Sequence, residues 1–191
     1  PLTRMKVQIS LQKDEKAKSE LEVDVNEMTS MLDSYVSFVK TESPEPIETI
    51  IINELIGDIV KTVEKNGVEL TINEKNTVKT SGRQIQLKRA FNNIIDNSKR
   101  YAKKIEIILY TNEKDCVIEF NDDGEGIPRD KYEDVFKPFF TLDPSRNKLK
   151  GESGLGLSIT RDIIRSHGGD VKLSDSNLGG LQLKVLLPLW F

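Results

Sequence analysis

The sequence has little cysteine, no long apolar run and no excess of basic residues, and each absence excludes a class of protein. The single cysteine, Cys116, rules out an intrachain disulfide framework and favours a reducing compartment. It shares one face of a predicted strand with Ile118 and Phe120, so we expect a buried, inert thiol. No apolar stretch approaches the length of a membrane span, and we find no signal peptide. The net charge of −3, from 28 basic and 31 acidic residues, gives no indication of nucleic-acid binding.

The 191 residues, 37% of them hydrophobic, are enough for one ordinary domain and a small appendage. The chain begins PLTRMKV, without an initiator methionine, so we expect it to be a piece of a longer protein. Residues 1–43 have the pattern of a helical hairpin. Its second helix carries an apolar seam at alternating steps of four and three, formed by Leu21, Val25, Met28, Leu32, Tyr35 and Val39.

A shorter apolar seam, formed by Leu2, Met5 and Ile9, lies on the preceding helix, and the polar residues 13–19 are a suitable connection. One hairpin cannot bury two such seams well. The hairpin either packs on the rest of the chain or pairs with a second copy to complete a four-helix bundle. The regularity of the second seam favours the dimer.

Two prolines, Pro44 and Pro46, mark a short linker at residues 44–48, because proline breaks helices and stiffens the backbone. Residues 49–191 then alternate helix and strand patterns. The predicted strands are 50–52, 68–72, 76–80, 104–110, 116–121, 171–175 and 181–189, and the predicted helices are 53–65, 83–102, 129–136 and 155–166, with Asn53 as the cap of the first. Strand pairs separated by helices predict an α+β sandwich, in which helices cover one face of a mixed sheet.

Two asparagines lie four residues apart in the predicted helix 83–102. Asn93 and Asn97 therefore project from one face of the helix, one turn apart. Asparagine is a mediocre helix former, so two on one face need a reason. An amide oxygen is a suitable ligand for Mg²⁺, which keeps several waters and takes its other oxygens from phosphates. The alternative is a solvated polar face, followed by cations that suit the helix C-terminus.

The loop NDDGEGIP, residues 121–128, follows a predicted strand and combines adjacent carboxylates with glycines. Asp122, Gly124 and Gly126 form the pattern D-x-G-x-G. A carboxylate can accept a hydrogen bond from an exocyclic amine, and the glycines let a flat ring lie against the main chain. The alternative is a plain turn, in which D-x-G is common.

A glycine-rich turn, KGESGLGLSIT, leads into the predicted helix 155–166. Gly151, Gly154 and Gly156 would leave backbone N–H groups free to bind an anion at the helix N-terminus. The spacing differs from that of the phosphate-binding loop G-x-x-x-x-G-K-[ST]. The alternative is a tight turn with a capped helix.

The segment VFKPFFTLDPSRNKLK lies between these two glycine-containing loops. It starts with Phe136, Phe139 and Phe140 and then becomes polar and basic. A loop of this length within a compact domain is usually a lid or a binding element, and its apolar start would anchor it. The alternative is a buried aromatic cluster under a surface loop.

The order of these four elements within one continuous stretch resembles the N, G1, F and G2 boxes of bacterial sensor histidine kinases. Their ATP-binding domain is a branch of the superfamily shared with gyrase and Hsp90. The opening PLTRMKV resembles the residues that follow the phosphoacceptor histidine in such kinases, and GGL at 179–181 resembles their late glycine pair. The osmosensor-type subgroup is the most similar.

This resemblance implies a fold and a reaction. The fold would be a dimeric helical hairpin followed by an α/β sandwich of the histidine kinase, gyrase and Hsp90 type. ATP with Mg²⁺ would bind in the sandwich, and the γ-phosphoryl group would pass to a histidine on the hairpin and then to an aspartate of a response-regulator receiver domain. The parent protein would sit in the inner membrane through parts outside this chain, with this portion in the cytoplasm.

The resemblance also implies roles for individual residues. Asn97 would bind Mg²⁺, and Asn93 would be the catalytic residue that polarises or orients the phosphoacceptor histidine. Asp122 would accept a hydrogen bond from the adenine amino group. The expected ATP-binding residues are Asn97, Arg100, Tyr101, Asp122, Gly124, Gly126, Ile127, Phe136, Arg146, Gly154, Leu155, Gly156 and Leu157.

Several features depart from the family pattern. Glu152 replaces a glycine of the last box, and Thr141 stands where related lids often carry arginine. By the family's spacing the phosphoacceptor would lie upstream of Pro1, so we expect this chain to bind ATP without phosphorylating itself. The only histidine, His167, ends a predicted helix, where it can charge favourably against the helix dipole, and we interpret it as structural.

Two rival functions remain open. An ATPase of the gyrase and Hsp90 type normally carries a glutamate at the position of Asn93 to activate water, so Asn93 and the preceding hairpin argue against it. A non-enzymatic dimerisation and docking module with a degenerate nucleotide site has Glu152 as its only support.

Overall fold

The computed structural model describes residues 45–63, 68–142 and 154–189 continuously, together with scattered positions between 5 and 29. Most of the predicted helical hairpin therefore lies outside the described residues, as do Arg146, Gly151 and Glu152. Among the described residues, we find no helix with the length and apolar character needed to cross a membrane.

A five-stranded mixed sheet forms the centre of the molecule, with strand order β2-β4-β5-β7-β6. Its strands are β2 (Glu69–Glu74), β4 (Lys104–Thr111), β5 (Asp115–Asp122), β6 (Asp170–Asp175) and β7 (Leu181–Pro188). The β2–β4 pair is parallel and the other pairs are antiparallel. A separate antiparallel pair consists of β1 (Glu48–Ile51) and β3 (Lys79–Gly82).

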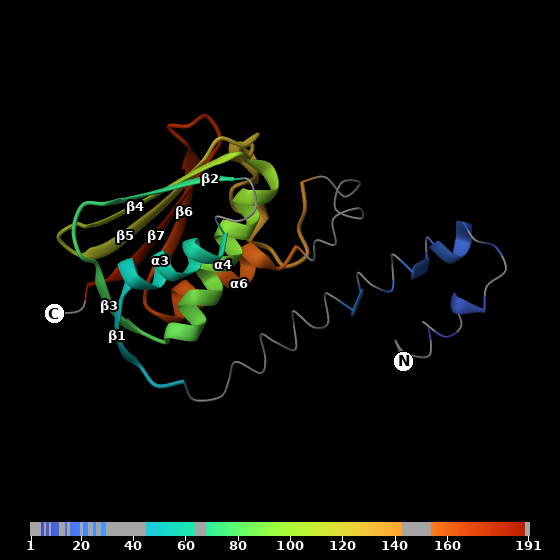
Figure 1. Ribbon diagram of the computed structural model, residues 1–191, viewed down its shortest axis with the longest axis horizontal. Coiled ribbons are helices and arrows are strands. Elements are labelled where there is room, and N and C mark those ends of the chain that lie inside the picture. The colour runs from blue at the N-terminus through green and yellow to red at the C-terminus, as the bar shows by residue number, and fades with distance from the viewer. Residues whose placement is uncertain are drawn as a thin grey trace.

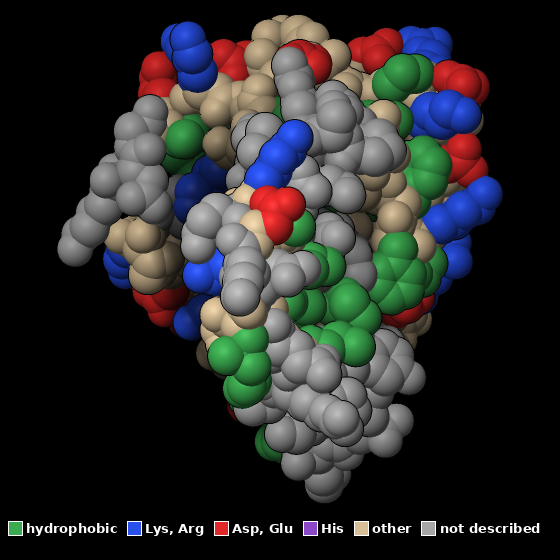
Figure 2. Space-filling model, turned by 90° about the vertical axis from the view of Figure 1, so that its right-hand side faces the viewer, with side chains coloured by type: hydrophobic (Ala, Val, Ile, Leu, Met, Phe, Trp, Pro, Cys, Tyr) green, Lys and Arg blue, Asp and Glu red, His purple; other side chains and the backbone are tan. Residues whose placement is uncertain are grey.

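Three helices lie together on one face of this sheet (Figure 1). They are α3 (Ile52–Val63), α4 (Gln84–Tyr101) and α6 (Gly156–Ser166). The predicted α/β sandwich, with a mixed sheet covered on one face, is confirmed. Charged side chains of both signs are interspersed around the rim of the face shown in Figure 2, as the near balance of acidic and basic residues leads one to expect.

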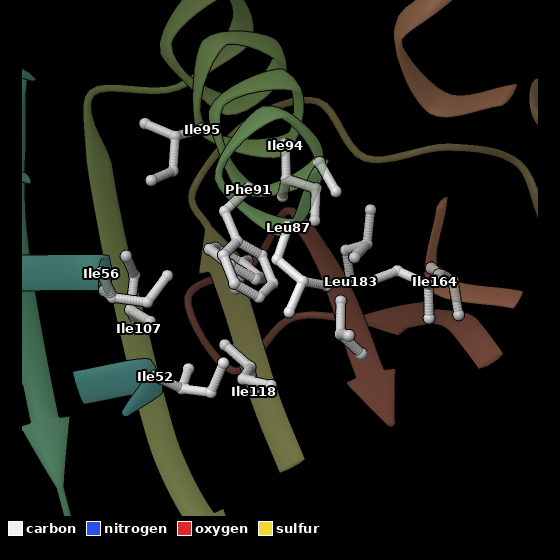
Figure 3. Close-up of a cluster of buried hydrophobic side chains, with 14 of the residues drawn as sticks. Ile52, Ile56, Leu87, Phe91, Ile94, Ile95, Ile107, Ile118, Ile164 and Leu183 are labelled. Carbon is white, nitrogen blue, oxygen red and sulfur yellow. The ribbon is translucent and has the colours of Figure 1, made fainter. Parts of the chain in front are cut away.

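The hydrophobic core lies between the sheet and the helices (Figure 3). Alternate residues of the central strands, such as Ile107 and Ile118, point toward the helix layer and are fully buried. Phe91 of α4 packs on Phe120 of β5, with ring centroids 6.0 Å apart. Each such side chain removed from water stabilises the fold by about 1.5–3 kcal/mol, so α4 is fixed firmly on the sheet.

Several local predictions differ from the structure. Asn53 does not cap α3 but lies within it, and its side chain holds the segment before β3 instead. Asn53 Oδ1 accepts a hydrogen bond from Val78 N–H (2.8 Å), and Nδ2 donates to Asn76 O (3.2 Å). The predicted helix 129–136 is two short 3₁₀ turns, η2 (Arg129–Lys131) and η3 (Asp134–Phe136). Strand β3 begins at Lys79, three residues after the predicted start.

The described positions near the N-terminus correct the predicted connection at residues 13–19. Lys16–Ser19 are helical, and Asp14 caps this turn by accepting hydrogen bonds from Lys16 N–H (2.9 Å) and Ala17 N–H (3.2 Å). The connection therefore ends before Lys16, because a capping carboxylate is available within the polar run.

The N-terminus of α4 has no local side-chain cap, and its first turn contains no acidic residue. Two residues that are distant in sequence satisfy its N–H groups instead. Ile85 N–H donates to Glu45 Oε1 (2.5 Å), and Arg83 N–H donates to His167 Nε2 (3.0 Å). The predicted linker residue Glu45 is therefore attached to the start of α4.

His167 is held as a neutral imidazole. Its Nε2 accepts the hydrogen bond from Arg83, so Nδ1 carries the proton and faces Ile163 O at 2.7 Å. Burial lowers the pKa of His167. The prediction that this histidine charges favourably at the helix end is therefore wrong, because its ring is partly buried and one nitrogen is needed as an acceptor. Its interpretation as a structural residue fits this geometry.

Cys116 is fully buried, as predicted. Its thiol lies 2.8 Å from Lys79 O, and burial raises the pKa of Cys116 to about 11. The thiol therefore stays protonated at neutral pH and is a poor nucleophile.

The substitution His167→Gln tests the neutral-histidine contact. The folded-state pKa of His167 lies below its unfolded value of roughly 6.5, so the folded state binds fewer protons. Its stabilising contribution is present above pH 6.5 and is lost as the pH falls below that value. We expect the free energy of unfolding of the wild type, from urea titrations, to decline more steeply between pH 7.5 and 5 than that of His167→Gln. Identical pH profiles would contradict a depressed pKa.

Candidate functional site

Helix α4 forms one wall of the candidate site. Asn93 and Asn97 lie one turn apart on it, and both side chains are half-buried. Asn93 Nδ2 donates to Gly156 O (3.2 Å), which brings the middle of α4 against the start of α6. The side chain of Asn97 makes no hydrogen bond to another described residue, so its amide oxygen is available to a ligand.

Asp122 ends β5 with a buried carboxylate that accepts three hydrogen bonds from the protein. Oδ1 accepts from Gly124 N–H (3.0 Å) and from Leu181 N–H (3.0 Å). Oδ2 accepts from the hydroxyl of Ser98 on α4 (3.2 Å). Since a carboxylate offers about four lone-pair positions, about one remains on Asp122.

Glycines make this cradle possible because backbone lies directly against the carboxylate. A Cβ atom on Gly180 would stand 2.4 Å from both Asp122 Oδ1 and Gly124 N. A Cβ atom on Gly124 would stand 3.1 Å from Tyr101 O, at the last turn of α4. The D-x-G-x-G loop and the late glycine pair therefore meet at Asp122.

The neighbouring carboxylate, Asp123, has a different task. Its Oδ1 accepts hydrogen bonds from Lys103 N–H (2.7 Å) and Lys104 N–H (2.8 Å), where α4 gives way to β4. The hydrogen bond from Lys104 is the main cause that lowers the pKa of Asp123. Asp123 is thus a structural link between the loop and the end of α4.

The glycine-rich turn enters α6 beside Asn93. Gly154 has a φ of 63°, which favours glycine, and Gly156 is the first residue of the helix. Leu155 at the N-cap provides no side-chain hydrogen bond, so the first N–H groups of α6 lack a side-chain cap. Such a helix end favours an anion.

The segment that contains Phe136, Phe139 and Phe140 is held on the domain just before its polar part begins. Phe136 is buried beneath Arg161, whose guanidinium carbon lies 4.4 Å from the ring centroid and which pairs with Glu133 (2.7 Å). Phe139, in contrast, is 56% exposed, has a φ of 64°, and donates from its N–H to Gly154 O (2.9 Å). The prediction of a buried anchor holds for Phe136 but is wrong for Phe139, which instead joins the two ends of the polar stretch.

The remaining predicted site residues occupy varied surroundings. Leu155 is buried, while Ile127 and Leu157 are partly buried against the core. Arg100 and Tyr101 are exposed on the last turn of α4. Gly126, with a φ of 71°, lies near Gly180. Arg146 lies outside the described residues.

Sequence reasoning missed part of the cradle around Asp122. Ser98, which donates to the carboxylate, is adjacent to Asn97 and resembles any other polar residue of the helix. Gly180 and Leu181 were noted only as a glycine motif, although both contact Asp122. A clue was present in the sequence: Ser98 continues the apolar stripe of α4 at the spacing of Phe91 and Ile94 and must therefore face inward.

The arrangement can hold a ligand with an amine at one end and an anion at the other. From Asn93 to Tyr101, α4 spans about 12 Å. Along that length lie, in order, the N-terminus of α6, which Leu155 does not cap with a side-chain hydrogen bond, the amide of Asn97 and the acceptor Asp122. Among the described residues, no three carboxylates, cysteines or histidines gather as a metal site. A cation there would therefore take most ligands from water or from the bound molecule. The amide of Asn97, which makes no hydrogen bond to another described residue, fits Mg²⁺ held in that way.

Comparison with known proteins agrees with this geometry. A family model described as histidine kinase-, DNA gyrase B-, and HSP90-like ATPase matches residues 82–190. The sensor histidine kinase GtrS of Pseudomonas aeruginosa is 30% identical over 190 residues, which cover 98% of this chain and 39% of that protein. The sensor histidine kinase CpxA of Escherichia coli K12 is 31% identical over 202 residues, covering 100% of this chain and 44% of that protein. The chain thus spans about two fifths of these relatives.

Solved structures share the fold. The mycobacterial sensor histidine kinase MprB superposes with a TM-score of 0.67 at 24% identity, covering 75% of this chain and 98% of that chain. The ATP-binding domain of PrrB from Mycobacterium tuberculosis superposes with a TM-score of 0.65 at 21% identity, covering 76% and 98%.

The substitution Gly180→Ala tests the cradle. The new methyl group would overlap Asp122 Oδ1 and Gly124 N, so we expect the free energy of unfolding to fall by about 1–3 kcal/mol. Gly57→Ala is the control, because nothing lies within 4 Å of its Cβ position in α3, and it should instead stabilise by about 0.5–1 kcal/mol. Urea unfolding measures both. Equal stability of Gly180→Ala and the wild type would show that the cradle is looser than described.

Proposed function

Because the chain belongs to the family of histidine kinase-, DNA gyrase B- and HSP90-like ATPases, we propose that it binds ATP with Mg²⁺ beside α4. We further propose that it is the nucleotide-binding part of a bacterial two-component sensor histidine kinase. In that protein the γ-phosphoryl group would pass to a histidine and then to an aspartate of a response-regulator receiver domain.

The observation that carries this proposal is the Asp122 carboxylate. Three protein donors hold it in place, and about one acceptor position remains. An adenine amino group supplies one N–H at such a position. Gly124 and Gly126 leave backbone uncovered nearby, which suits a flat ring, and Ile127 offers an apolar edge.

The triphosphate would extend along α4 toward α6. The uncapped N-terminus of α6, entered through Gly154, Leu155, Gly156 and Leu157, would donate N–H groups to phosphate oxygens. Arg100 and Tyr101 would contact the phosphates and the ribose, and Arg146 would supply a further positive charge. Phe136 would support this region from beneath.

Asn97 would hold Mg²⁺ through its free amide oxygen, and the cation would neutralise charge on the phosphates when bound. Asn93 stands one turn earlier. Its Nδ2 is engaged by Gly156 O, which leaves Oδ1 to accept a hydrogen bond from the incoming imidazole. Catalysis would then rest mainly on positioning and on charge neutralisation.

Assembly and location follow the same proposal. Residues 1–43 would form the helical hairpin, 44–48 the linker, and 49–191 the catalytic domain. Apolar side chains at described helical positions are exposed, among them Met5, Leu21 and Met28, and a second copy would cover them in a homodimer. The domain would lie in the cytoplasm, with the membrane reached through other parts of the parent protein.

The substitution Asp122→Asn tests the adenine contact. Asparagine presents an NH₂ group where the carboxylate offers acceptors, so we expect the Kd for ATP, from titration calorimetry, to rise roughly 10- to 100-fold. Asp123→Asn is the matched control, since it removes an adjacent charge but keeps an acceptor for Lys103 and Lys104, and its Kd should stay within about twofold. Equal effects of both substitutions would contradict the assignment.

Removal of Mg²⁺ tests Asn97. We expect chelation by EDTA to weaken ATP binding to the wild type roughly tenfold or more, and to have much less effect on Asn97→Ala, which has already lost its protein ligand. Asp96→Ala, one residue earlier on the exposed side of α4, should respond to EDTA as the wild type does. An undiminished EDTA effect in Asn97→Ala would exclude it as a metal ligand.

A further inference from the structure

Ser98 is buried near the C-terminal end of α4, yet its hydroxyl does not bond to its own helix. Other helix hydroxyls in the described chain donate to a carbonyl three or four residues earlier, as Thr62, Ser158, Thr160 and Ser166 do. Ser98 Oγ donates instead to Asp122 Oδ2 (3.2 Å), across the space between α4 and β5. Both residues are 5% exposed.

This contact completes a set of donors that comes from three different parts of the chain. Gly124 and Leu181 fix Oδ1 of Asp122 through their N–H groups, but a carboxylate held at one oxygen can still rotate about its terminal torsion, which is broad. Ser98 restrains the second oxygen. The hydroxyl uses its single proton in doing so, which leaves lone pairs on both Ser98 and Asp122.

We propose that Ser98 is a positioning and specificity residue for the nucleobase, an inference that rests on the proposed ATP site. Ser98 orients the remaining acceptor of Asp122 toward an exocyclic amine, and together the two side chains present acceptors only. A purine with an amino group at its six position supplies the matching N–H. A purine with an oxygen there would place an acceptor against acceptors and leave buried polar groups unpaired.

A cycle of residue and ligand changes separates this role from a structural one. The probes are ATP and purine riboside 5′-triphosphate, which lacks the six-amino group, and the proteins are the wild type and Ser98→Ala. We expect Ser98→Ala to raise the Kd for ATP about 3- to 10-fold, because the hydrogen bond that orients the Asp122 carboxylate is lost. The Kd for purine riboside triphosphate should change less than twofold, because that ligand has no amine to be positioned. Inosine triphosphate should become a relatively better competitor of ATP in Ser98→Ala.

The matched control is Thr80→Val. Thr80 also has a buried hydroxyl that donates to another element, to Pro188 O (2.9 Å). Pro188 lies at the opposite end of β7 from Leu181, about 20 Å away along the strand. Its removal should leave both nucleotide affinities unchanged. Alanine is a better helix former than serine, so Ser98→Ala should remain folded, which circular dichroism at the titration temperature checks.

The outcomes are distinct. Equal loss of affinity for both triphosphates, or no loss for either, overturns the role of Ser98 and leaves the ATP site intact. Failure of the wild type to bind ATP overturns the proposed function and this inference with it. Selective loss for ATP supports both.

Discussion

The arrangement of the site depends on one buried carboxylate and the three hydrogen bonds that it accepts. Burying a charged group without partners would be costly, and no cation pairs with Asp122 among the described residues. Its partners come from α4, from the loop after β5 and from the start of β7. Satisfying this one group therefore requires three separate segments to converge, and the glycines at 124 and 180 follow from the lack of room for side chains around it.

Helix α4 is the element on which these segments converge, and both of its ends are held by residues from elsewhere. Glu45 and His167 bond the N–H groups at its start, and Asp123 bonds the backbone just beyond its end. Between them, Phe91 and its apolar neighbours fix the helix on the sheet. The two asparagines thus stand on a rigid support, whereas residues on a free surface helix would have to be ordered by the ligand itself at an entropic cost.

The sequence was sufficient for the helices predicted at 53–65, 83–102 and 155–166 and for most strands, because these follow from hydrophobic periodicity and turn chemistry. The expectation that the glycine loops lie beside α4 came from the resemblance to sensor histidine kinases. The sequence was not sufficient for side chains whose hydrogen-bond partners come from distant parts of the chain. Asn53 was expected to cap its own helix, but the segment before β3 offered it a better partner in Val78. His167 was expected to be charged, but the ring lies against Arg83, a neighbour that no local pattern reveals. Ser98 went unnoticed because its role requires Asp122, which follows 24 residues later.

The adjacent carboxylates Asp122 and Asp123 have different roles because neighbouring side chains of a strand point to opposite faces of the sheet. Side chains alternate along β5, and Cys116, Ile118 and Phe120 all face the helices. Asp122 is the next member of this series, so it must point into the helix layer, where only hydrogen-bond donors make it tolerable. Asp123 falls just past the strand, outside the core, where it is free to bond the exposed backbone of Lys103 and Lys104. Removal of one residue from β5 would bring Asp123 into the place of Asp122 and turn Asp122 to the opposite face of the sheet. The strand register, more than the identity of either aspartate, therefore determines which carboxylate can serve a ligand.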